Sequence, residues 1–393
     1  MKGADAEQAK AAWPGRPGLY VHVPFCASTC DFCAFYQVKP TAASMESFLT
    51  GVAAERDLVP GASSFATVFW GGGTPGLLAP AALARLAAVV GSPKAPPAEW
   101  TVELAPASVT PQRLEVLRAA GVTRLSLGVQ SFQPGWLEAL GRQHSVEQVR
   151  RAYDRIRAGG WTNVNLDLMF AFPGQSEADW QADLTEAIAL APEHISTYCL
   201  TFEEDTALWA KLSRGKVKLD PEKELAFYEA GWARLAGAGY GQYEVSNFAR
   251  PGYACRHNLA TWAMQDWVGL GPSAASQCGG WRGTNVADLG LWRERVAAGQ
   301  RMTEARVPLN PSLLAEDALI FGLRMNAGVD LAVWRARCPE APWGEFETTL
   351  GRLAEGGLVE AEGSRVRLTH RGRLLADAVG AELISVPAAS SGV

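Results

Sequence analysis

Three cysteines stand close together near the start of the chain, at Cys26, Cys30 and Cys33. Their C-x3-C-x2-C spacing puts three thiolates on one short loop. Three thiolates can hold three irons of a [4Fe-4S] cluster, and the fourth iron is then without a protein ligand. A zinc site and scattered buried thiols are the alternatives, but structural zinc takes four protein ligands and this triplet supplies three. The spacing therefore predicts a cluster with one iron open for chemistry.

A glycine-rich turn is the second candidate for a binding element. Residues 71–75 read GGGTP and follow a short β-rich run over residues 67–70. Consecutive glycines let the backbone turn tightly and present its amide and carbonyl groups to a ligand at close range. Such a turn at a strand end is often purely structural. Its occurrence together with the cysteine loop favours ligand binding.

Three polar side chains stand near the ends of otherwise apolar predicted strands: Glu103 in TVELAP, Gln130 in LSLGVQSF and Asp167 in NVNLDLMF. Carboxylates are costly to bury without partners, so these positions predict a shared polar cavity at one end of a sheet. A basic partner is then expected. Arg142 in GRQH is the candidate, because a guanidinium grips a carboxylate with two hydrogen bonds. The alternative for Arg142 is a helix cap or a surface position.

Alternating strands and helices must position these groups. Strands are expected at residues 19–23, 67–70, 100–104, 123–130, 163–170 and 194–201, and helices at 44–58, 81–90, 111–120, 146–158, 177–190 and 221–238. Such alternation predicts a parallel sheet with right-handed crossovers. Six units are too few for a closed eight-stranded barrel. The expected fold is therefore α/β, a partial (β/α)6 barrel with the cysteine loop at the carboxyl end of its first strand.

The alternation stops near residue 240, which suggests further units. We expect a flexible amino terminus (1–17), the barrel (18–240), an extension closing the barrel (241–310), a carboxyl-terminal module (311–385) and a disordered tail (386–393). In the module, helices at 313–324, 331–337, 344–354 and 370–383 flank two short strands near Val359 and Val366. This order predicts a winged-helix-like unit. Its net negative charge argues against DNA reading, so we expect a docking or lid module.

Composition restricts the class of protein. Of the 393 residues, 20% are charged, and the net charge of −5 offers no basic field for nucleic acid. The seven cysteines are an odd number with a single tight cluster, which argues against a disulfide framework and favours a reducing compartment. No apolar run is long enough for a membrane span, and the amino terminus lacks a signal-peptide core. A cytoplasmic protein without an integral membrane segment is expected.

The cysteine loop, with the aromatic Phe32 between its last two cysteines, resembles that of the radical S-adenosylmethionine (SAM) superfamily. The resemblance implies that the amino and carboxylate groups of SAM chelate the open iron. It also implies that a reducing electron donor delivers one electron through the cluster, which splits SAM into methionine and a 5′-deoxyadenosyl radical.

Further motifs make the resemblance more specific. Tyr20 with the cysteine loop, GGGTP, ELAP, GVQSF followed by GRQH, NLDLMFAFPGQ, and CRHNLATW resemble the family of oxygen-independent coproporphyrinogen III dehydrogenase (HemN) and the haem chaperone HemW. The similarity covers roughly residues 20–383. It implies that the three cysteines bind the cluster, and it assigns SAM contacts to Tyr20 and Phe32 in the pocket wall, Gly72, Gly73 and Thr74 in the turn, Gln130 and Asp167 at the ribose, and Glu103 with Arg142 at the carboxylate end.

Two departures bear on the choice within this family. The dehydrogenase carries an additional cysteine two positions beyond the third, where this chain has Phe35. HemW-type chains have an HNxxY segment associated with haem binding, and here the tyrosine position is Thr261. His257 in this segment is either a haem ligand or a structural residue, and Cys255 is a second possible ligand.

Two hypotheses follow from the resemblance. The preferred one is a HemW-type protein that binds a [4Fe-4S] cluster and SAM, handles haem or another tetrapyrrole, and delivers it to a recipient protein. The alternative is a radical SAM enzyme that abstracts hydrogen from a porphyrinogen or another substrate.

Overall fold

The structure is a computed structural model that describes residues 16–59, 64–91, 95–204, 206–214 and 220–384. The predicted flexible terminus, apart from residues 16 and 17, and the predicted tail lie outside the described residues.

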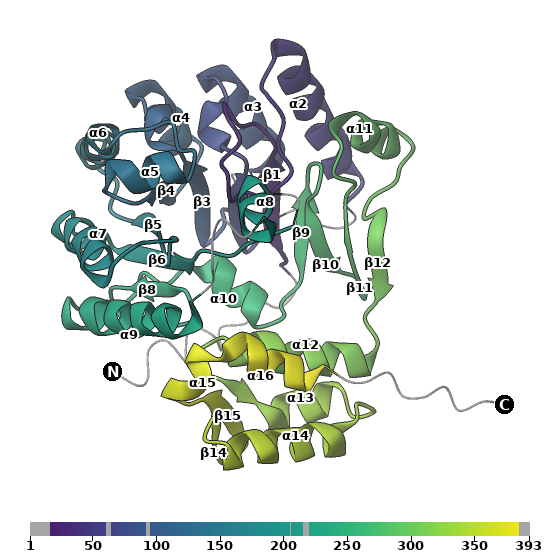
Figure 1. Cartoon of the computed structure of the whole chain (residues 1–393). Coiled ribbons are helices and arrows are strands. Elements are labelled where there is room, and N and C mark those ends of the chain that lie inside the picture. Colours follow the sequence, from purple (N-terminus) through teal and green to yellow (C-terminus); the bar gives the residue numbers. More distant parts are fainter. Residues whose placement is uncertain (1–15, 60–63, 92–94, 205, 215–219, 385–393) are drawn as a thin grey trace.

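Six parallel strands in sequence order form the centre of the molecule (Figure 1). Helices cover the outer face of this curved sheet, as right-handed crossovers require. The predicted α/β partial barrel is confirmed. The strands are β1 (Gly18–Val23), β2 (Thr67–Gly72), β3 (Glu99–Leu104), β4 (Arg124–Gln130), β5 (Val164–Phe170) and β6 (His194–Cys199). The helices between and after them are α2 (Ala42–Asp57), α3 (Pro80–Val90), α4 (Pro111–Ala119), α5 (Pro134–Ala139), α6 (Val146–Ala158), α7 (Glu177–Ala189), α8 (Ala207–Ser213) and α9 (Pro221–Gly237), with short 3-10 turns at Pro75–Leu77 and Pro106–Ser108.

The two faces of the sheet differ in polarity because successive strand residues point to opposite sides. On the outer face, Trp70 and Trp100 are almost wholly buried and their rings meet edge to face with centroids 5.4 Å apart. The alternate positions Thr67 and Glu103 face inward. The apolar core therefore lies between the sheet and its helices, and the inner face is left for polar groups.

The extension widens both edges of the sheet instead of joining them. Strands β7 (Gly241–Gln242) and β8 (Asn247–Ala249) continue the sheet beyond β6, and β9 (Trp267–Leu270) pairs in parallel with β1. In the described parts of the chain no pairing joins β7 to β12, so hydrogen bonding leaves the barrel open. The remaining elements are α10 (Arg256–Trp262), β10 (Ala275–Cys278), β11 (Trp281–Thr284), α11 (Leu289–Ala297) and β12 (Glu304–Pro308).

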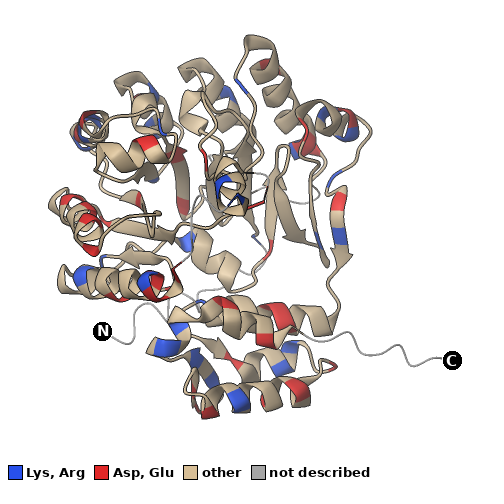
Figure 2. Cartoon of the chain, in the orientation of Figure 1, with Lys and Arg blue, Asp and Glu red and all other residues tan. Residues whose placement is uncertain are grey.

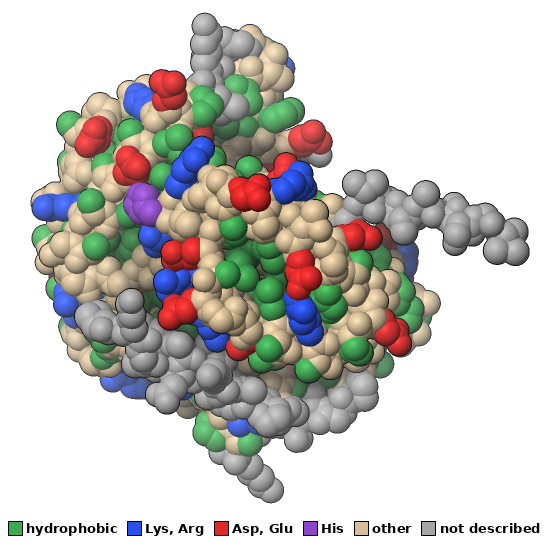
Figure 3. Space-filling model, turned by 90° about the horizontal axis from the view of Figure 1, so that it is seen from below, with side chains coloured by type: hydrophobic (Ala, Val, Ile, Leu, Met, Phe, Trp, Pro, Cys, Tyr) green, Lys and Arg blue, Asp and Glu red, His purple; other side chains and the backbone are tan. Residues whose placement is uncertain are grey.

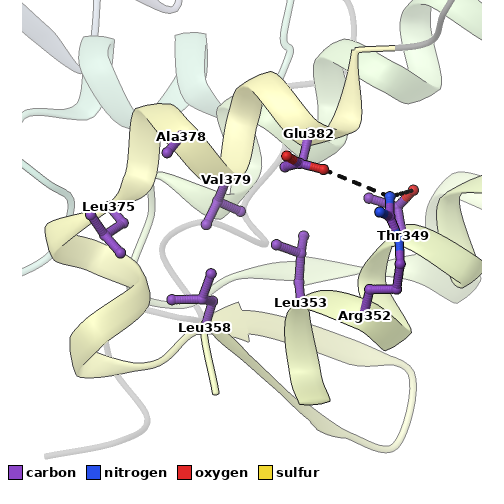
Figure 4. Close-up of a pocket in the computed structure, with 8 residues that line it drawn as sticks. All are labelled: Thr349, Arg352, Leu353, Leu358, Leu375, Ala378, Val379 and Glu382. Atoms are coloured by element: carbon purple, nitrogen blue, oxygen red, sulfur yellow. Dashed lines mark hydrogen bonds and ion pairs between the residues drawn. The ribbon is translucent and has the colours of Figure 1, made fainter. Parts of the chain in front are cut away.

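The carboxyl-terminal module has a hydrophobic core of its own and lies below the barrel, next to α9 and α10 (Figure 1). The helix expected at 370–383 is two helices that meet at Leu375. A cavity of about 300 Å³ lies between α14 and α16, lined by Leu353, Leu358 and Val379 and bordered by the ion pair of Arg352 with Glu382 (Figure 4). The module contains α12 (Pro311–Leu323), β13 (Val329–Asp330), α13 (Leu331–Arg337), α14 (Trp343–Glu355), β14 (Val359–Glu362), β15 (Arg365–Leu368), α15 (His370–Leu374) and α16 (Ala376–Leu383).

Charges are interspersed over the outer helices (Figure 2), and the face seen from below mixes acidic, basic and apolar side chains (Figure 3). A mixture of this kind does not attract a polyanion in the way that a basic patch would. No helix in the described ranges is both long and apolar enough to cross a bilayer.

Candidate cofactor site

The cysteine loop leaves the carboxyl end of β1, and two other loops hold it there. Asp31 in the loop donates its N–H to the Leu140 carbonyl (3.1 Å), and its own carbonyl accepts the N–H of Leu208 in α8 (2.9 Å). The Asp31 carboxylate pairs with Lys211 of the same helix at 2.7 Å. The end of α5, after β4, and helix α8, after β6, therefore hold the cysteine loop in place.

The thiols of this loop suit a cluster better than a single metal ion. Cys26, Cys30 and Cys33 are free and partly exposed. Within the described ranges no three His, Cys, Asp or Glu side chains are arranged to hold one ion. In a [4Fe-4S] cluster each thiolate binds a different iron, so the sulfurs need not converge on one point. The donor set therefore fits three irons of a cluster.

The charges around the three thiols also favour an iron–sulfur cluster at this loop. Burial raises the pKa of Cys26, and the two neighbouring thiols raise it further, while Thr74 and Arg142 lower it. The Arg142 guanidinium donates to the Cys30 sulfur at 3.3 Å. Three thiolates this close repel one another in the absence of a cation. A positively charged iron core would remove that repulsion.

The GGGTP turn lies directly against the cysteine loop. Gly73 donates its N–H to the Val23 carbonyl (2.9 Å), and Thr74 donates to the Phe25 carbonyl (2.8 Å). A Cβ atom on Gly73 would lie 2.7 Å from the Phe25 oxygen, so only glycine permits this approach. Gly72, with a φ of +97°, lies in the left-handed region that favours glycine. The two motifs that stood out in the sequence thus form one surface.

Two carboxylates and two phenols project from the inner face of the sheet below this surface. Burial raises the pKa of Glu103 to about 8, with a further contribution from the negative charge of Asp167. Burial and Glu103 likewise raise the pKa of Tyr20. Tyr198 exposes 39% of its surface, yet the surrounding protein raises its pKa far above the ordinary value. Tyr198 is therefore partly exposed and yet surrounded by protein groups. The two carboxylates that were predicted to share a polar cavity lie close enough on the inner face of the sheet for the charge of Asp167 to act on Glu103.

The end of β4 is irregular where Gln130 leaves it. Gln130 has a φ of 69°, an uncommon conformation for a residue with a side chain, and the pairing with β5 shifts between Gly128 and Gln130. Arg142 donates to the Gly128 carbonyl at 3.0 Å as well as to Cys30. Among the ion pairs of the described residues, none joins Arg142 to Glu103. Arg142 thus contacts the cluster loop, and its expected role with Glu103 at the carboxylate end of SAM stays a prediction.

Phe32 lies on the side of the cysteine loop that faces the loops after β5 and β6. It packs against a small apolar cluster that includes Leu140, Met169, Phe172 and Leu208. Its ring therefore contributes to the wall between the cluster loop and α8.

Arg124 is the basic residue of the barrel interior that sequence reasoning missed. It is only 2% exposed, and the charges of Glu99 and Asp167 help to raise its pKa against the effect of burial. A charged residue at the start of an apolar strand, RLSLGVQ, is the signal that could have found it. That signal is weak, because a strand's first residue is ordinarily near solvent.

His257 lies at the opposite end of the barrel from the cysteine loop. Its Nδ1 is 2.9 Å from the Thr67 hydroxyl at the start of β2, and its ring lies 5.3 Å from that of Phe69. The length of β1, about 16 Å, separates these contacts from the cluster loop. His257 is 7% exposed, and burial lowers its pKa to about 4. Its Nδ1 is engaged with Thr67, and the buried ring is held at this end of the barrel.

The neighbours of His257 are buried in the same way. Cys255 is fully buried, and its thiol donates to Glu99 at 3.4 Å. Thr261, which stands at the HNxxY tyrosine position, donates its hydroxyl to the His257 carbonyl (3.0 Å). Trp262 packs against Phe321 of the carboxyl-terminal module. The segment joins the barrel floor to the module, and the structure does not bring it together with the cluster loop.

Comparison with known proteins gives the superfamily and the fold. Residues 20–187 match the sequence model of the Radical SAM superfamily, and residues 309–375 match that of the HemN C-terminal domain. The fold is similar to coproporphyrinogen III oxidase (HemN) from Escherichia coli, with a TM-score of 0.79 over 96% of this chain and 92% of that chain. The identity is 24%, so this likeness concerns the fold alone. Fold, cysteine loop and superfamily match together define a radical SAM protein.

Relatives with higher sequence identity to this chain identify its family within the superfamily. The chain is 38% identical to heme chaperone HemW of Mycobacterium tuberculosis over 94% of this chain and 95% of that one. It is 32% identical to heme chaperone HemW of Bacillus subtilis over 92% of this chain and 97% of that one. The chain belongs to the HemW family of radical SAM proteins. Membership of this superfamily implies a [4Fe-4S] cluster and SAM as cofactors.

Proposed function

We propose that this protein is a haem chaperone, which binds haem or a related tetrapyrrole and delivers it to a recipient protein. The observation that carries the proposal is the 38% identity, over almost the whole chain, to a protein named for that function. The likeness to HemN is a likeness of fold and does not by itself favour porphyrinogen chemistry.

The cofactor assignments follow from the family to which the chain belongs and from the motifs that it shares with that family. In this proposal Cys26, Cys30 and Cys33 hold the cluster, which when reduced supplies one electron to SAM. The remaining contacts to SAM are assigned to residues from five strands and their loops. They are Tyr20, Phe32, Gly72, Gly73, Thr74, Glu103, Gln130, Arg142 and Asp167.

The residue at position 35, a phenylalanine, favours a chaperone function over dehydrogenase activity. It stands two positions after Cys33, where the resemblance places an additional cysteine in the dehydrogenase, and its side chain is 66% exposed. A phenyl ring has no thiol to donate hydrogen, coordinate a metal or accept an electron. We therefore expect no conversion of coproporphyrinogen III to protoporphyrinogen IX, even with cluster and SAM loaded.

The test is anaerobic reconstitution followed by haem titration and a SAM-cleavage assay on the same sample. We expect the wild-type protein to bind haem and to form little 5′-deoxyadenosine in proportion to any modified product. Cys26→Ala, prepared in parallel, is the control for cleavage that does not depend on the cluster. Robust decarboxylation of the porphyrinogen without haem binding would overturn the proposal.

A further inference from the structure

A continuous chain of hydrogen bonds runs from Asp167 on β5 through the neighbouring strand β6 to the extension. The Asp167 Oδ1 accepts from the side-chain amide of Asn165 at 2.8 Å. The Asn165 Oδ1 in turn lies 2.6 Å from His194 Nδ1, and His194 Nε2 lies 2.8 Å from the Tyr243 hydroxyl. Asn165 and His194 are fully or almost fully buried. The chain therefore joins β5, β6 and the segment between β7 and β8 in the interior of the protein.

The direction of each hydrogen bond follows from the chemistry of its ends. The Tyr243 oxygen accepts the backbone N–H of Cys255 at 3.2 Å, so its own proton is left for His194 Nε2. Burial, aided by Arg124, lowers the pKa of His194 well below its ordinary value, and the ring is neutral. A neutral imidazole that accepts at Nε2 carries its proton at Nδ1. His194 therefore donates to the Asn165 oxygen.

This assignment fixes which side of the Asn165 amide faces Asp167. With its oxygen turned to His194, Asn165 presents both hydrogens of its NH2 group, one to Asp167 and one to the Ser126 oxygen at 2.7 Å. Ser126 then gives its own proton to Asp167 Oδ2 at 3.0 Å. The Asp167 carboxylate thus accepts from Asn165 at Oδ1 and from Ser126 at Oδ2, and the Ser196 hydroxyl also favours its charged form. A carboxylate oxygen can accept more than one hydrogen bond, so capacity for a ligand remains.

We propose that Asn165, His194 and Tyr243 are positioning residues that hold Asp167 in the orientation in which it accepts hydrogen bonds from the ribose hydroxyls of SAM. The proposal rests on the proposed role of Asp167 in the SAM site. Tyr243 also contributes one of the contacts between the barrel and the carboxyl-terminal module, since its carbonyl accepts the N–H of Asn326 at 2.9 Å. The residues that orient the cofactor carboxylate thus extend to the contact with that module.

Tyr243→Phe is the sharpest perturbation, because it removes one hydroxyl and keeps the ring. Without the phenol proton, His194 is free to take the other tautomer and offer a lone pair to the Asn165 oxygen. The Asn165 amide is then held less firmly in the orientation that presents its NH2 group to Asp167. We expect the dissociation constant for SAM, measured by calorimetry on the reconstituted protein, to rise by about threefold to tenfold, the range of one neutral hydrogen bond. Unchanged affinity would overturn the proposal.

Tyr240→Phe is the matched control. Tyr240 is 1% exposed and its hydroxyl donates to the Pro192 carbonyl at 2.8 Å, outside the chain to Asp167. Its loss removes a comparable buried hydrogen bond. We expect a similar fall in stability with wild-type affinity for SAM, and an equal loss of SAM affinity in both variants would refute a specific role for Tyr243.

A double-mutant cycle separates positioning from a merely structural effect. If Tyr243 acts through Asp167, then Tyr243→Phe in the Asp167→Ala background weakens SAM binding no further. Multiplication of the two single losses would overturn the proposal. The Asp167→Ala variant also tests whether Asp167 binds SAM at all. Wild-type affinity for SAM in this variant would refute that role.

Variants of His194 supply a second test of the proposal that does not depend on Tyr243. His194→Asn places an N–H at about the position of Nδ1, while His194→Leu places none. We expect the asparagine variant to bind SAM more tightly than the leucine variant at equal iron content. Equal affinity of the two would contradict the role of His194 as a donor.

Discussion

Replacement of Gly73 by alanine tests the contact between the GGGTP turn and the cysteine loop. The added Cβ would lie 2.7 Å from the Phe25 oxygen and 2.8 Å from the Val23 oxygen, whereas ordinary van der Waals contact begins at 3.4 Å. Both neighbours are backbone atoms of β1 and the residues that follow it, and they cannot rotate away. The turn must therefore move by about 0.7 Å.

That movement is enough to break the hydrogen bonds that hold the turn. The bond from Gly73 to the Val23 carbonyl is 2.9 Å long, so the same displacement takes it beyond the range in which a hydrogen bond counts. The bond from Thr74 to the Phe25 carbonyl is strained in the same way. Two backbone bonds at about 0.5 to 1.5 kcal/mol each predict a loss of about 1 to 3 kcal/mol in the free energy of unfolding.

Denaturant unfolding, iron content and calorimetric SAM titration measure the consequences on one preparation. We expect the Gly73→Ala variant to be less stable and to bind SAM at least tenfold more weakly, because the turn that meets the cofactor has moved. Gly135→Ala is the control, since a Cβ there has no atom within 4 Å. Wild-type stability and SAM affinity in Gly73→Ala would refute the inferred contact.

Three further predictions concern the cluster, the pH dependence and the haem ligand. Alanine at any one of the three loop cysteines should abolish the visible [4Fe-4S] absorption, while Cys338→Ala should leave the iron content unchanged; four irons retained in a loop variant would contradict the cluster assignment. Because the pKa of Glu103 rises from 4.5 to about 8 on folding, the folded state holds the proton more tightly, and stability should fall as the pH rises between these values. Glu103→Gln should weaken this dependence in melting experiments at several pH values, and an unchanged slope would refute it. Haem titration of His257→Ala should show that haem binding is retained. The variant should lose about 1 to 3 kcal/mol in the free energy of unfolding, because the Thr67 hydroxyl is left unpaired. Loss of haem binding at wild-type stability would restore His257 as the ligand.

Much of the site was predictable because its signals are local. The three cysteines and the GGGTP turn each lie within a few residues of sequence, and each directly follows a strand. Glu103 and Asp167 were found because a carboxylate in an apolar strand is costly unless it faces a polar site. The positions of β1 to β6 followed from the alternation of apolar runs with helical spacing.

Long-range packing decided what the sequence left open. Arg142 was expected, with Glu103, at the carboxylate end of SAM, and only the fold shows that its guanidinium also donates to the Cys30 sulfur. Arg124 lies close enough to Cys255, next to α10, and to Tyr243 for both to raise its pKa, and both are more than a hundred positions away in the sequence. Strand periodicity shows the face on which a side chain lies, but it does not show which later segment will cover it.

The sequence by itself determined the class of cofactor, the six repeating units and the kind of module at the carboxyl end, because these depend on spacing and periodicity within short segments. Only the tertiary structure decided that His257 lies at the floor of the barrel, about the length of β1 away from the cysteine loop. It also decided that Asn165, His194 and Tyr243 align behind Asp167. Hydrogen bonds between strands that are far apart in the sequence depend on register and shear, and no local sequence pattern encodes them.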